Sequence, residues 1–300
     1  MLALRHNLEY ALLRSALGAF DLLPLSGASW LGRRLADLWW LVDGRRRRVA
    51  VSNILRCGIE SDPGRARTLS RRSSEHFAQV VIESLKSAQL LDQGRWRESL
   101  RLDVHPEVRE VLDTPGQGLI MASGHFGNWE IAAQVLSRWK PVAGITRTMN
   151  NPKSEALIQR RKPRYDFRPI PKYDANPGRF VQILEQGEIL ALLTDQYAHT
   201  RGAQIPFFGH PASTHTTAAM LHLVTRTPLC FGACRRLPDG ERGDGSARFE
   251  LTTSPLITIE RTGNRKRDTA TILATLNEHL EASIRRDPDQ YLWGHRRWRD

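Results

Sequence analysis

Apolar residues near the start of the chain recur at intervals of three and four, the spacing that puts side chains on one face of an α-helix. Leu13, Leu17 and Phe20 follow this spacing. A second segment continues it and is rich in leucine and tryptophan; its apolar members are Trp30, Leu31, Leu35, Leu38, Trp39 and Leu41. The pattern predicts a mainly helical region over residues 1–95.

Arginines flank the second of these segments, at positions 33 and 34 and in the run 45–48. Apolar and aromatic faces beside basic residues are typical of helices that lie in a membrane interface. A pair of ordinary amphipathic helices packed on the core, with a solvated basic run, would give the same pattern. The sequence therefore predicts an N-terminal helical membrane-associating segment and leaves this alternative open.

The apolar stretch at residues 8–25 is interrupted by Arg14 and Asp21. A spanning helix needs roughly 18 or more uninterrupted apolar residues. No small-residue cleavage site follows the stretch, so it does not match an export signal either.

After residue 100 the pattern changes to short apolar strands that alternate with helices. The strands are expected at 118–123, 141–146, 189–194, 229–235 and 248–253, and the helices at 128–139, 180–186, 216–226 and 268–286. Such alternation predicts an α/β fold with a mixed, mostly parallel sheet flanked by helices. We therefore expect a helical region over residues 1–95 and one continuous α/β core over residues 96–300.

The chain carries a formal net charge of +12 and a sequence pI of about 10.3. An excess of this kind favours nucleic acid, an anionic membrane surface or an acidic protein as partner. The sequence has no zinc-finger spacing, RNA-recognition aromatic motif or basic zipper. We expect an anionic membrane surface and no nucleic acid, with a basic nucleic-acid-binding protein as a rival hypothesis.

Three cysteines, Cys57, Cys230 and Cys234, are too few and too scattered for a disulfide framework. Cys230 and Cys234 are four residues apart in a predicted strand, which places them on one face. We expect them to be small core residues.

The strongest chemical signal lies between Gly118 and Glu130, in the run Gly-Leu-Ile-Met-Ala-Ser-Gly-His-Phe-Gly-Asn-Trp-Glu. An apolar strand ends there and a helix begins, so His125 sits at a strand-to-helix turn. Open α/β sheets place their ligand sites at such turns. Glu130 falls in the first turns of the helix, from where its carboxylate could reach back to the imidazole.

A histidine and a carboxylate suit general-base chemistry. Histidine titrates near neutral pH and can take the proton of a weakly nucleophilic hydroxyl. A carboxylate on the other ring nitrogen orients the imidazole and stabilises its charged form. The spacing alone has little weight, because it occurs three times, in His105/Glu110, His125/Glu130 and His295/Asp300. Only His125 follows an apolar strand and is bracketed by glycines; a helix-capping or core histidine is the alternative.

With this motif the chain resembles the bacterial lipid A biosynthesis acyltransferases of the lauroyl and myristoyl transferase type, within the lysophospholipid acyltransferase superfamily. Several blocks carry the resemblance, which covers about residues 45–298: Gly124-His-Phe-Gly-Asn-Trp-Glu130, Arg147-Thr-Met-Asn-Asn-Pro152, Leu193-Thr-Asp-Gln196, Ile205-Pro-Phe-Phe-Gly209 and Tyr291-Leu-Trp-Gly-His-Arg-Arg297.

The resemblance implies roles for particular residues. His125 would be the general base and Glu130 its partner. Substrate-binding roles are implied for Asn128, Arg147, Asp195 and Gln196. For Arg147 a surface or structural salt bridge is the alternative, and for the Asp195–Gln196 pair it is a structural role in holding a loop.

The basic block 295–297 is expected either to bind phosphate or membrane or to form a solvated tail. Two departures from the family pattern stand out. The N-terminal spanning helix is weak, and Thr194 stands where a proline is expected.

The implied reaction moves a fatty acyl chain from a thioester of acyl carrier protein or coenzyme A to a hydroxyl of a lipid acceptor. That acceptor would be a lipid A precursor or a related glycolipid or phospholipid. No cofactor and no metal is expected, since the histidines at 210, 215 and 222 lack the acidic or cysteine context of a zinc site.

The implied location is the cytoplasmic face of the bacterial inner membrane, with peripheral or N-terminally anchored attachment. A non-catalytic lipid-binding relative and an acyl-thioester hydrolase remain as alternatives.

Overall fold

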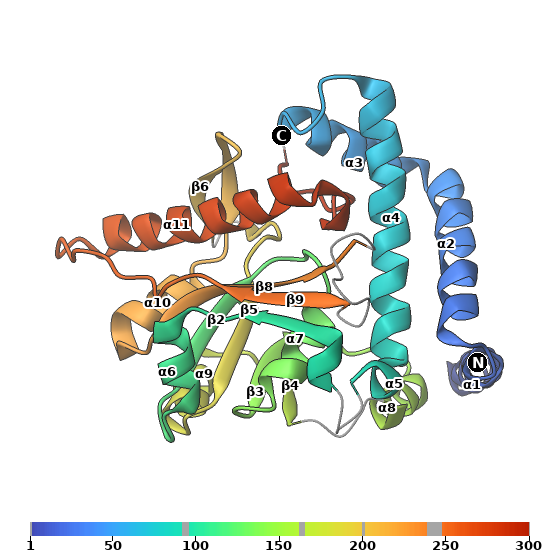
Figure 1. Cartoon of the computed structure of the whole chain (residues 1–300), viewed down its shortest axis with the longest axis horizontal. Coiled ribbons are helices and arrows are strands. Elements are labelled where there is room, and N and C mark those ends of the chain that lie inside the picture. Colours follow the sequence, from blue (N-terminus) through green and yellow to red (C-terminus); the bar gives the residue numbers. More distant parts are fainter. Residues whose placement is uncertain (1, 92–95, 162–165, 200–201, 239–247, 300) are drawn as a thin grey trace.

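The computed structural model describes residues 2–91, 96–161, 166–199, 202–238 and 248–299 (Figure 1). The helices are α1 (Leu2–Asp21), α2 (Leu25–Val42), α3 (Gly44–Arg56), α4 (Pro63–Leu85), α5 (Ser87–Leu90), α6 (Pro106–Asp113), α7 (Trp129–Leu136), α8 (Pro152–Arg161), α9 (Pro177–Glu185), α10 (Thr217–Thr225) and α11 (Arg265–Arg286). The 3-10 helices are η1 (Trp96–Ser99) and η4 (Pro288–Gln290). The strands are β1 (Leu100–Asp103), β2 (Leu119–Ser123), β3 (Val142–Thr146), β4 (Phe167–Pro171), β5 (Ile189–Leu193), β6 (Ala203–Phe207), β7 (His210–Thr214), β8 (Leu229–Arg236) and β9 (Phe249–Thr253).

Seven strands form one sheet in the order β1-β9-β8-β2-β5-β3-β4. The neighbours from β8 to β4 are all parallel, and only β9 runs antiparallel to β8. Strands β6 and β7 form a separate antiparallel pair. Because β2 and β5 are adjacent and parallel, their carboxyl ends meet at the same edge of the sheet.

Alternate residues of the central strands pack into two apolar clusters, one on each face of the sheet. Ile120 and Ala122 of β2 lie in a cluster with side chains of α3, α4, α9, α10 and α11. Leu119 and Met121 lie in the other, with side chains of α5, α6 and α7. Burial on both faces explains why the strand is a continuous apolar run rather than an alternating one. Figure 1 shows α11 on one side of the sheet and α6 and α7 on the other.

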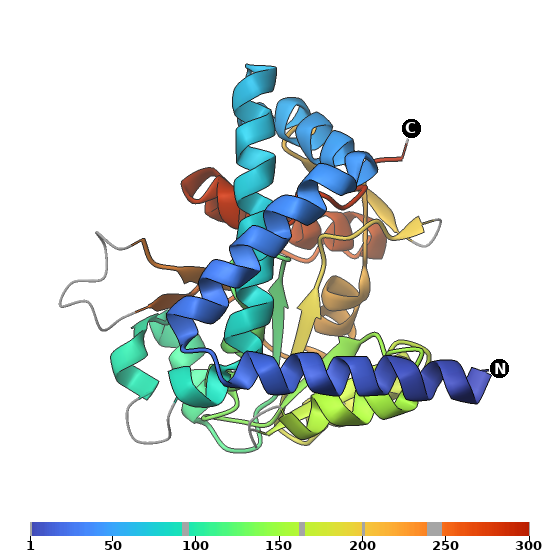
Figure 2. The same ribbon diagram turned by 90° about the vertical axis from the view of Figure 1, so that its right-hand side faces the viewer.

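The N-terminal helices lie along one flank of the sheet. The long helix α4 packs against α7 and η4, α2 lies on the outer side of α4, and α1 runs alongside α8 (Figure 2). The Asn151 side-chain amide before α8 donates to the His6 carbonyl oxygen of α1 at 2.8 Å. Among the described residues, no helix has the length and apolar character needed to cross a membrane.

The predicted mostly parallel α/β sheet is confirmed, and so are the N-terminal helices. The sequence pattern missed β1, β4, β6 and β7, which are short and carry several exposed polar positions. The membrane contact of the helices and the division at residue 95 stay predictions. All three cysteines are free and buried, and burial raises the pKa of Cys57 and of Cys230 to about 12. Their predicted place in the core is confirmed.

Candidate active site

The loop between β2 and α7 is held tightly by the chain on both sides. The φ angle of Gly127 is +60°, and a Cβ there would collide with the carbonyl oxygen of Cys234 in β8. Only glycine accepts both the left-handed conformation and the close approach. At Gly124 a Cβ would lie 2.8 Å from a methyl group of Leu280. The glycines that bracket His125 therefore allow the loop to lie flat against β8 and α11.

The imidazole of His125 contacts a carboxylate from the neighbouring strand. His125 Nδ1 lies 2.8 Å from Asp195 Oδ1, and the backbone N–H of His125 donates to Asp195 Oδ2 at 2.9 Å. Asp195 follows β5, so the adjacent carboxyl ends of β2 and β5 bring the two residues together. The side chain of Asp195 is 4% exposed and that of His125 is 17% exposed, which leaves the imidazole reachable from solvent.

The electrostatics of the pair fix its protonation. Burial would raise the pKa of Asp195, but the His125 imidazole and its hydrogen bonds outweigh burial and hold that pKa at about 2. Burial would likewise lower the pKa of His125, but the charge of Asp195 and its hydrogen bond raise it above the ordinary value. An ionised carboxylate can only accept, so Nδ1 carries the proton in the neutral imidazole. Nε2 is then the basic nitrogen.

That basic nitrogen faces Gln196. The Gln196 amide nitrogen lies 3.2 Å from His125 Nε2 and donates to it in the neutral state. Gln196 is half-buried and lies next to Asp195 in the chain. A substrate hydroxyl that uses Nε2 as its base must take the position of this amide.

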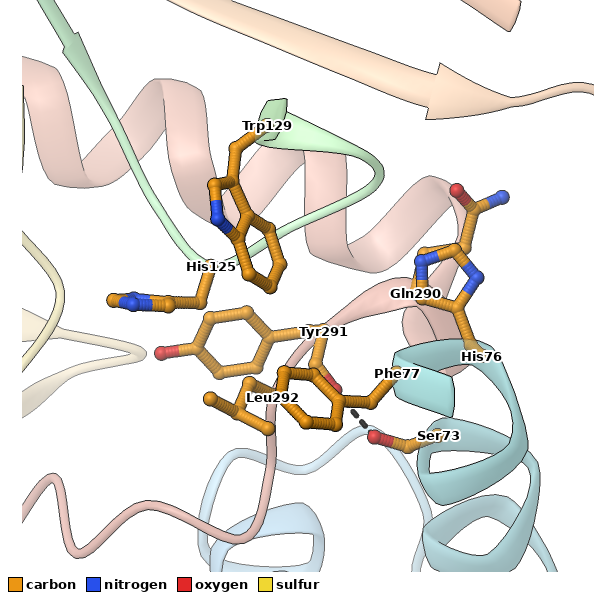
Figure 3. Close-up of a pocket in the computed structure, with 8 residues that line it drawn as sticks. All are labelled: Ser73, His76, Phe77, His125, Trp129, Gln290, Tyr291 and Leu292. Atoms are coloured by element: carbon orange, nitrogen blue, oxygen red, sulfur yellow. Dashed lines mark hydrogen bonds between the residues drawn. The ribbon is translucent and has the colours of Figure 1, made fainter. Parts of the chain in front are cut away.

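A C-terminal segment runs across the site. The backbone N–H of Leu292 donates to the His125 carbonyl oxygen at 3.0 Å, and Ser73 of α4 donates to the Tyr291 carbonyl oxygen at 2.5 Å. In Figure 3 the Tyr291 ring lies beside His125, and its hydroxyl points to the same side as the imidazole. Burial, then the charge of Asp195, raise the pKa of Tyr291 well above its ordinary value. Tyr291 therefore stays neutral beside the histidine–aspartate pair.

An aromatic recess opens beside the imidazole, between α4 and α7 (Figure 3). The Trp129 ring meets the His125 ring edge-on with centroids 5.1 Å apart and stacks on Phe77 at 6.2 Å. The rest of the lining comes from Ser73, His76, Gln290, Tyr291 and Leu292. Burial lowers the pKa of His76, whose Nε2 lies 3.2 Å from the Gly127 carbonyl oxygen, so a neutral ring donates there. The surface that the recess exposes is nevertheless apolar.

The carboxylate that contacts His125 is that of Asp195, and the role of partner predicted for Glu130 stays a prediction. Both ring nitrogens of His125 have other partners, Asp195 on Nδ1 and Gln196 on Nε2. Glu130 is half-buried in the first turn of α7, where a negative charge stabilises the positive end of the helix dipole.

The Asn128 side chain makes hydrogen bonds within the fold. It is fully buried, its side-chain oxygen accepts from the Ile131 N–H at 3.0 Å, and its amide nitrogen donates to Glu83 at 2.9 Å. It therefore caps α7 and ties this helix to α4. The substrate-binding role predicted for Asn128 stays a prediction.

Arg147 lies at the same edge of the sheet as His125. It follows β3, which is the second strand from β2 in the sheet, and its side chain is exposed. Gln196 and Asp195, by contrast, touch the imidazole directly.

The basic block near the C-terminus is partly internal. Arg297 is 2% exposed, and its guanidinium donates to the Ser213 carbonyl oxygen at 2.6 Å and to the Thr214 hydroxyl at 2.7 Å. His295 Nε2 accepts from the Tyr197 backbone N–H at 3.1 Å. Arg297 thus ties the C-terminal segment to the end of β7, and His295 ties it to the loop after β5. Of this block, only Arg296 is exposed.

Sequence reasoning did not assign to Asp195 the role of orienting His125, and it did not single out Tyr291. A signal for Asp195 was present, because a carboxylate directly after an apolar strand is placed at the carboxyl edge of a parallel sheet. Tyr291 is the first residue of the block 291–297 that supports the family resemblance, but no neighbouring residue marks it as part of a reactive site.

Comparisons with known proteins agree on one family. A family model for the bacterial lipid A biosynthesis acyltransferases matches residues 3–300. A lipid A biosynthesis lauroyltransferase of Escherichia coli (strain K12) is 24% identical over 85% of this chain and 79% of its own length. A lipid A biosynthesis palmitoleoyltransferase of the same organism is 25% identical over 92% of this chain and 86% of its own.

Proposed function

Because the chain belongs to the bacterial lipid A biosynthesis acyltransferase family, we propose that it moves a fatty acyl chain from an acyl thioester to a hydroxyl of a lipid A precursor. The enzyme class predicted from the sequence, an O-acyltransferase, is confirmed by this membership. The thioester donor, carried on acyl carrier protein or coenzyme A, and the residues that perform the reaction are part of the proposal.

The observation that carries the proposal is the buried Asp195 carboxylate on Nδ1 of a partly accessible His125. This contact fixes the tautomer, leaves Nε2 as the base and stabilises the imidazolium that forms when a proton arrives. The orienting role that spacing gave to Glu130 is therefore proposed for Asp195.

The reaction is a direct attack. The acceptor hydroxyl displaces the Gln196 amide from His125 Nε2, and its oxygen bonds to the thioester carbonyl carbon as its proton passes to Nε2. The tetrahedral intermediate then collapses, the carbon–sulfur bond breaks, and the imidazolium returns the proton to the departing thiolate. All atoms and charges balance without an enzyme nucleophile.

The oxyanion of that intermediate needs hydrogen-bond donors. Backbone amides after Gly124 are a poor source, because those of His125, Gly127 and Asn128 already donate to Asp195 and to the carbonyl oxygens of Gln290 and Cys234. The displaced Gln196 amide is a donor close to the reacting atoms, and preorganised donors of this kind contribute strongly to acyl transfer. We propose that Gln196 serves this purpose, with Arg147 at the same edge of the sheet for an anionic group of the substrate.

The recess is too shallow to enclose an acyl chain, but the exposed aromatic surface at its rim suits the start of one. Phe77 of α4 is 40% exposed, and it stacks on Trp129 directly beside the imidazole. Burying this surface against methylene groups is favourable by roughly 25 cal/mol per Å². The thioester carbonyl would then lie beside this aromatic surface, next to Nε2.

The proposed attachment to the membrane is peripheral and uses the N-terminal helices. Leu4, Leu8 and Leu12 of α1 repeat every four residues and are 75%, 61% and 64% exposed. On α2 a second stripe is exposed, formed by Leu31, Leu35, Leu38, Trp39 and Val42. Soluble proteins rarely leave such stripes uncovered, and both helices lie on the outer flank of the molecule (Figure 2).

The test is acyl transfer from labelled acyl carrier protein and acyl coenzyme A into a lipid A precursor, comparing wild type with His125→Ala. His105→Ala, from another His-x4-acid pair, is the matched control. Labelled lipid with wild type and the control but not with folded His125→Ala supports the proposal. Equal product from His125→Ala rejects His125 as the base, and free fatty acid as the sole product rejects the lipid acceptor.

A further inference from the structure

A basic groove lies between α3 and the start of α4. It has a volume of about 600 Å³. Arg47, Arg48 and Arg67 line it, together with the partly buried apolar side chains of Val51 and Leu55. The groove therefore joins positive charge to an apolar floor.

One side of the groove is rigidly built. The guanidinium groups of Arg47 and Arg67 lie over the Trp40 ring, 5.0 and 5.2 Å from its centroid. Arg47 Nη1 also donates to the carbonyl oxygens of Trp40 and Leu41, at 2.8 and 2.9 Å. Trp40 in turn donates to Ser70 at 3.1 Å. Planar guanidinium groups held in this way lose little entropy when they bind a phosphate.

The positive charge of the groove is not neutralised by the carboxylates around it. Within the part of the chain that the structure describes, the nearby carboxylates pair with other arginines: Asp43 with Arg46, and Glu60 with Arg65. Asp62 caps α4 by accepting from the Arg65 N–H at 2.8 Å. The first turn of α4 adds the positive end of its helix dipole beside Pro63.

The surroundings of the groove identify the kind of molecule that fits it. Helix α2 leads directly into α3, and its last residues, Trp39, Leu41 and Val42, are 56%, 60% and 72% exposed. If this apolar end enters a bilayer, the arginines that follow come to lie at the level of the lipid head groups. An acidic protein would need a far larger contact, roughly 800 Å² on each partner.

We propose that this groove binds the phosphate of an anionic membrane lipid, with its arginines on the phosphate oxygens and the Val51–Leu55 floor against the glycerol and the first methylene groups. The inference rests on the membrane attachment proposed above and is independent of the chemistry at His125. Helix α3 lies between the groove and the C-terminal segment, because Asn53 donates to the carbonyl oxygens of Trp293 and His295. A bound lipid therefore lies about one helix diameter, roughly 10 Å, from the segment that carries Tyr291.

The experiment compares Arg48→Gln/Arg67→Gln with a matched control, Arg72→Gln/Arg265→Gln, which removes the same charge from exposed positions outside the groove. Binding is measured by co-sedimentation with phosphatidylcholine vesicles that contain phosphatidylglycerol, and with vesicles of equal charge that contain oleate instead. We expect the groove variant to bind the phosphatidylglycerol vesicles about 30-fold more weakly, and the control to change little, because each basic residue at the surface contributes about 1 kcal/mol. Wild type should prefer phosphatidylglycerol to oleate.

Four outcomes would overturn the inference. Equal loss in both variants means diffuse charge attraction, and equal binding to oleate vesicles means that phosphate is not recognised. Unchanged vesicle binding with weakened binding of acyl carrier protein means an acidic protein partner. Binding of inorganic phosphate, lost in the groove variant, without any preference for phosphatidylglycerol vesicles means a free-anion site. Thermal unfolding and acyl transfer to detergent-dispersed lipid report folding and the proposed function separately, and neither should change.

Discussion

The two nitrogens of His125 have different tasks, and the residues around them differ accordingly. Nδ1 meets a buried carboxylate that stays ionised, and Nε2 meets a half-buried neutral amide. The first contact is permanent and sets the proton position. The second must break whenever a hydroxyl binds, so Asp195 and Gln196 should affect the reaction in different ways when they are replaced.

Asp195→Asn should lower kcat by roughly 10²- to 10⁴-fold, because the tautomer is no longer fixed and the imidazolium loses its counter-charge. Neutral His125 is the active form, so activity rises with pH through the His125 pKa, which Asp195 raises. Without that charge, burial alone remains and lowers the pKa. The acid limb of the pH–rate profile should therefore move to lower pH, as measured by single-turnover acyl transfer.

Glu130→Gln is the comparison for this prediction. It should leave the acid limb of the pH–rate profile unchanged and lower the rate much less, because Asp195 and Gln196 lie at the two imidazole nitrogens. If the acid limb of the pH–rate profile shifts in Glu130→Gln and does not shift in Asp195→Asn, Glu130 is the residue that orients His125.

Gln196 should raise the reaction rate by stabilising the transition state. Gln196→Ala removes a donor near the oxyanion, and the loss of one such donor costs about 10²- to 10³-fold in kcat. Gln196→Glu instead places a negative charge at Nε2, which raises the His125 pKa further and moves the acid limb to higher pH. If Gln196→Ala changes KM alone, the side chain contributes to ground-state binding and not to the oxyanion.

At the scale of elements, the catalytic loop depends on β8 as much as on its own strand. The Asn128 backbone N–H donates to the Cys234 carbonyl oxygen, and the Asn128 side chain connects α7 to Glu83 of α4. Glu83 is 1% exposed and also accepts from Arg236 at 2.7 Å. The position of His125 is thus set by contacts from α4, β8 and the C-terminal segment together.

Gly127→Ala tests this arrangement. The left-handed backbone alone costs about 1–2 kcal/mol for an alanine, and the collision with Cys234 adds to it. Gly58→Ala is the matched control, since its φ is +63° and a Cβ there meets nothing within 4 Å. Chemical denaturation should show the larger loss of stability for Gly127→Ala, which should also lose acyl transfer. Equal losses of stability would mean that the loop can move away from β8.

The sequence predicts this site only in part, for physical reasons. The buried run before His125 and the glycines around it indicate a strand that ends in a tight turn, and the structure has one. The pairing with Asp195 could not be predicted, because β3 and β4 intervene in the chain but not in the sheet, where β5 lies next to β2. Local spacing favoured Glu130, whereas strand order brings in a residue 70 positions away. Arg297 shows the same limit, because a basic run near a terminus does not reveal that its guanidinium binds buried oxygens of β7.

At the scale of the whole molecule, the N-terminal helices determine how the cleft meets a lipid surface. The exposed stripes of α1 and α2 and the basic groove beside α3 all lie on the part of the chain that precedes the sheet. A net charge of +12 attracts the molecule to an anionic surface over a distance set by ionic strength. The apolar stripes contribute to binding only where they touch the membrane. Raising the salt concentration therefore weakens the electrostatic contribution and leaves the apolar one.

Leu35→Gln/Trp39→Gln should therefore weaken binding to phosphatidylcholine vesicles with phosphatidylglycerol most clearly at high salt, where charge attraction is screened. Both side chains are more than half exposed, at 57% and 56%, so the fold should tolerate the change. Tyr173→Gln/Val224→Gln is the control, since these exposed side chains, at 94% and 61%, lie far along the chain from α2. Co-sedimentation across a salt series measures the effect. Burial of two large side chains contributes about 3–6 kcal/mol when complete, so even partial burial of the α2 stripe predicts a loss of at least about tenfold. A loss of equal size in the control, or a loss seen only at low salt, would show that α2 is not the face that enters the bilayer.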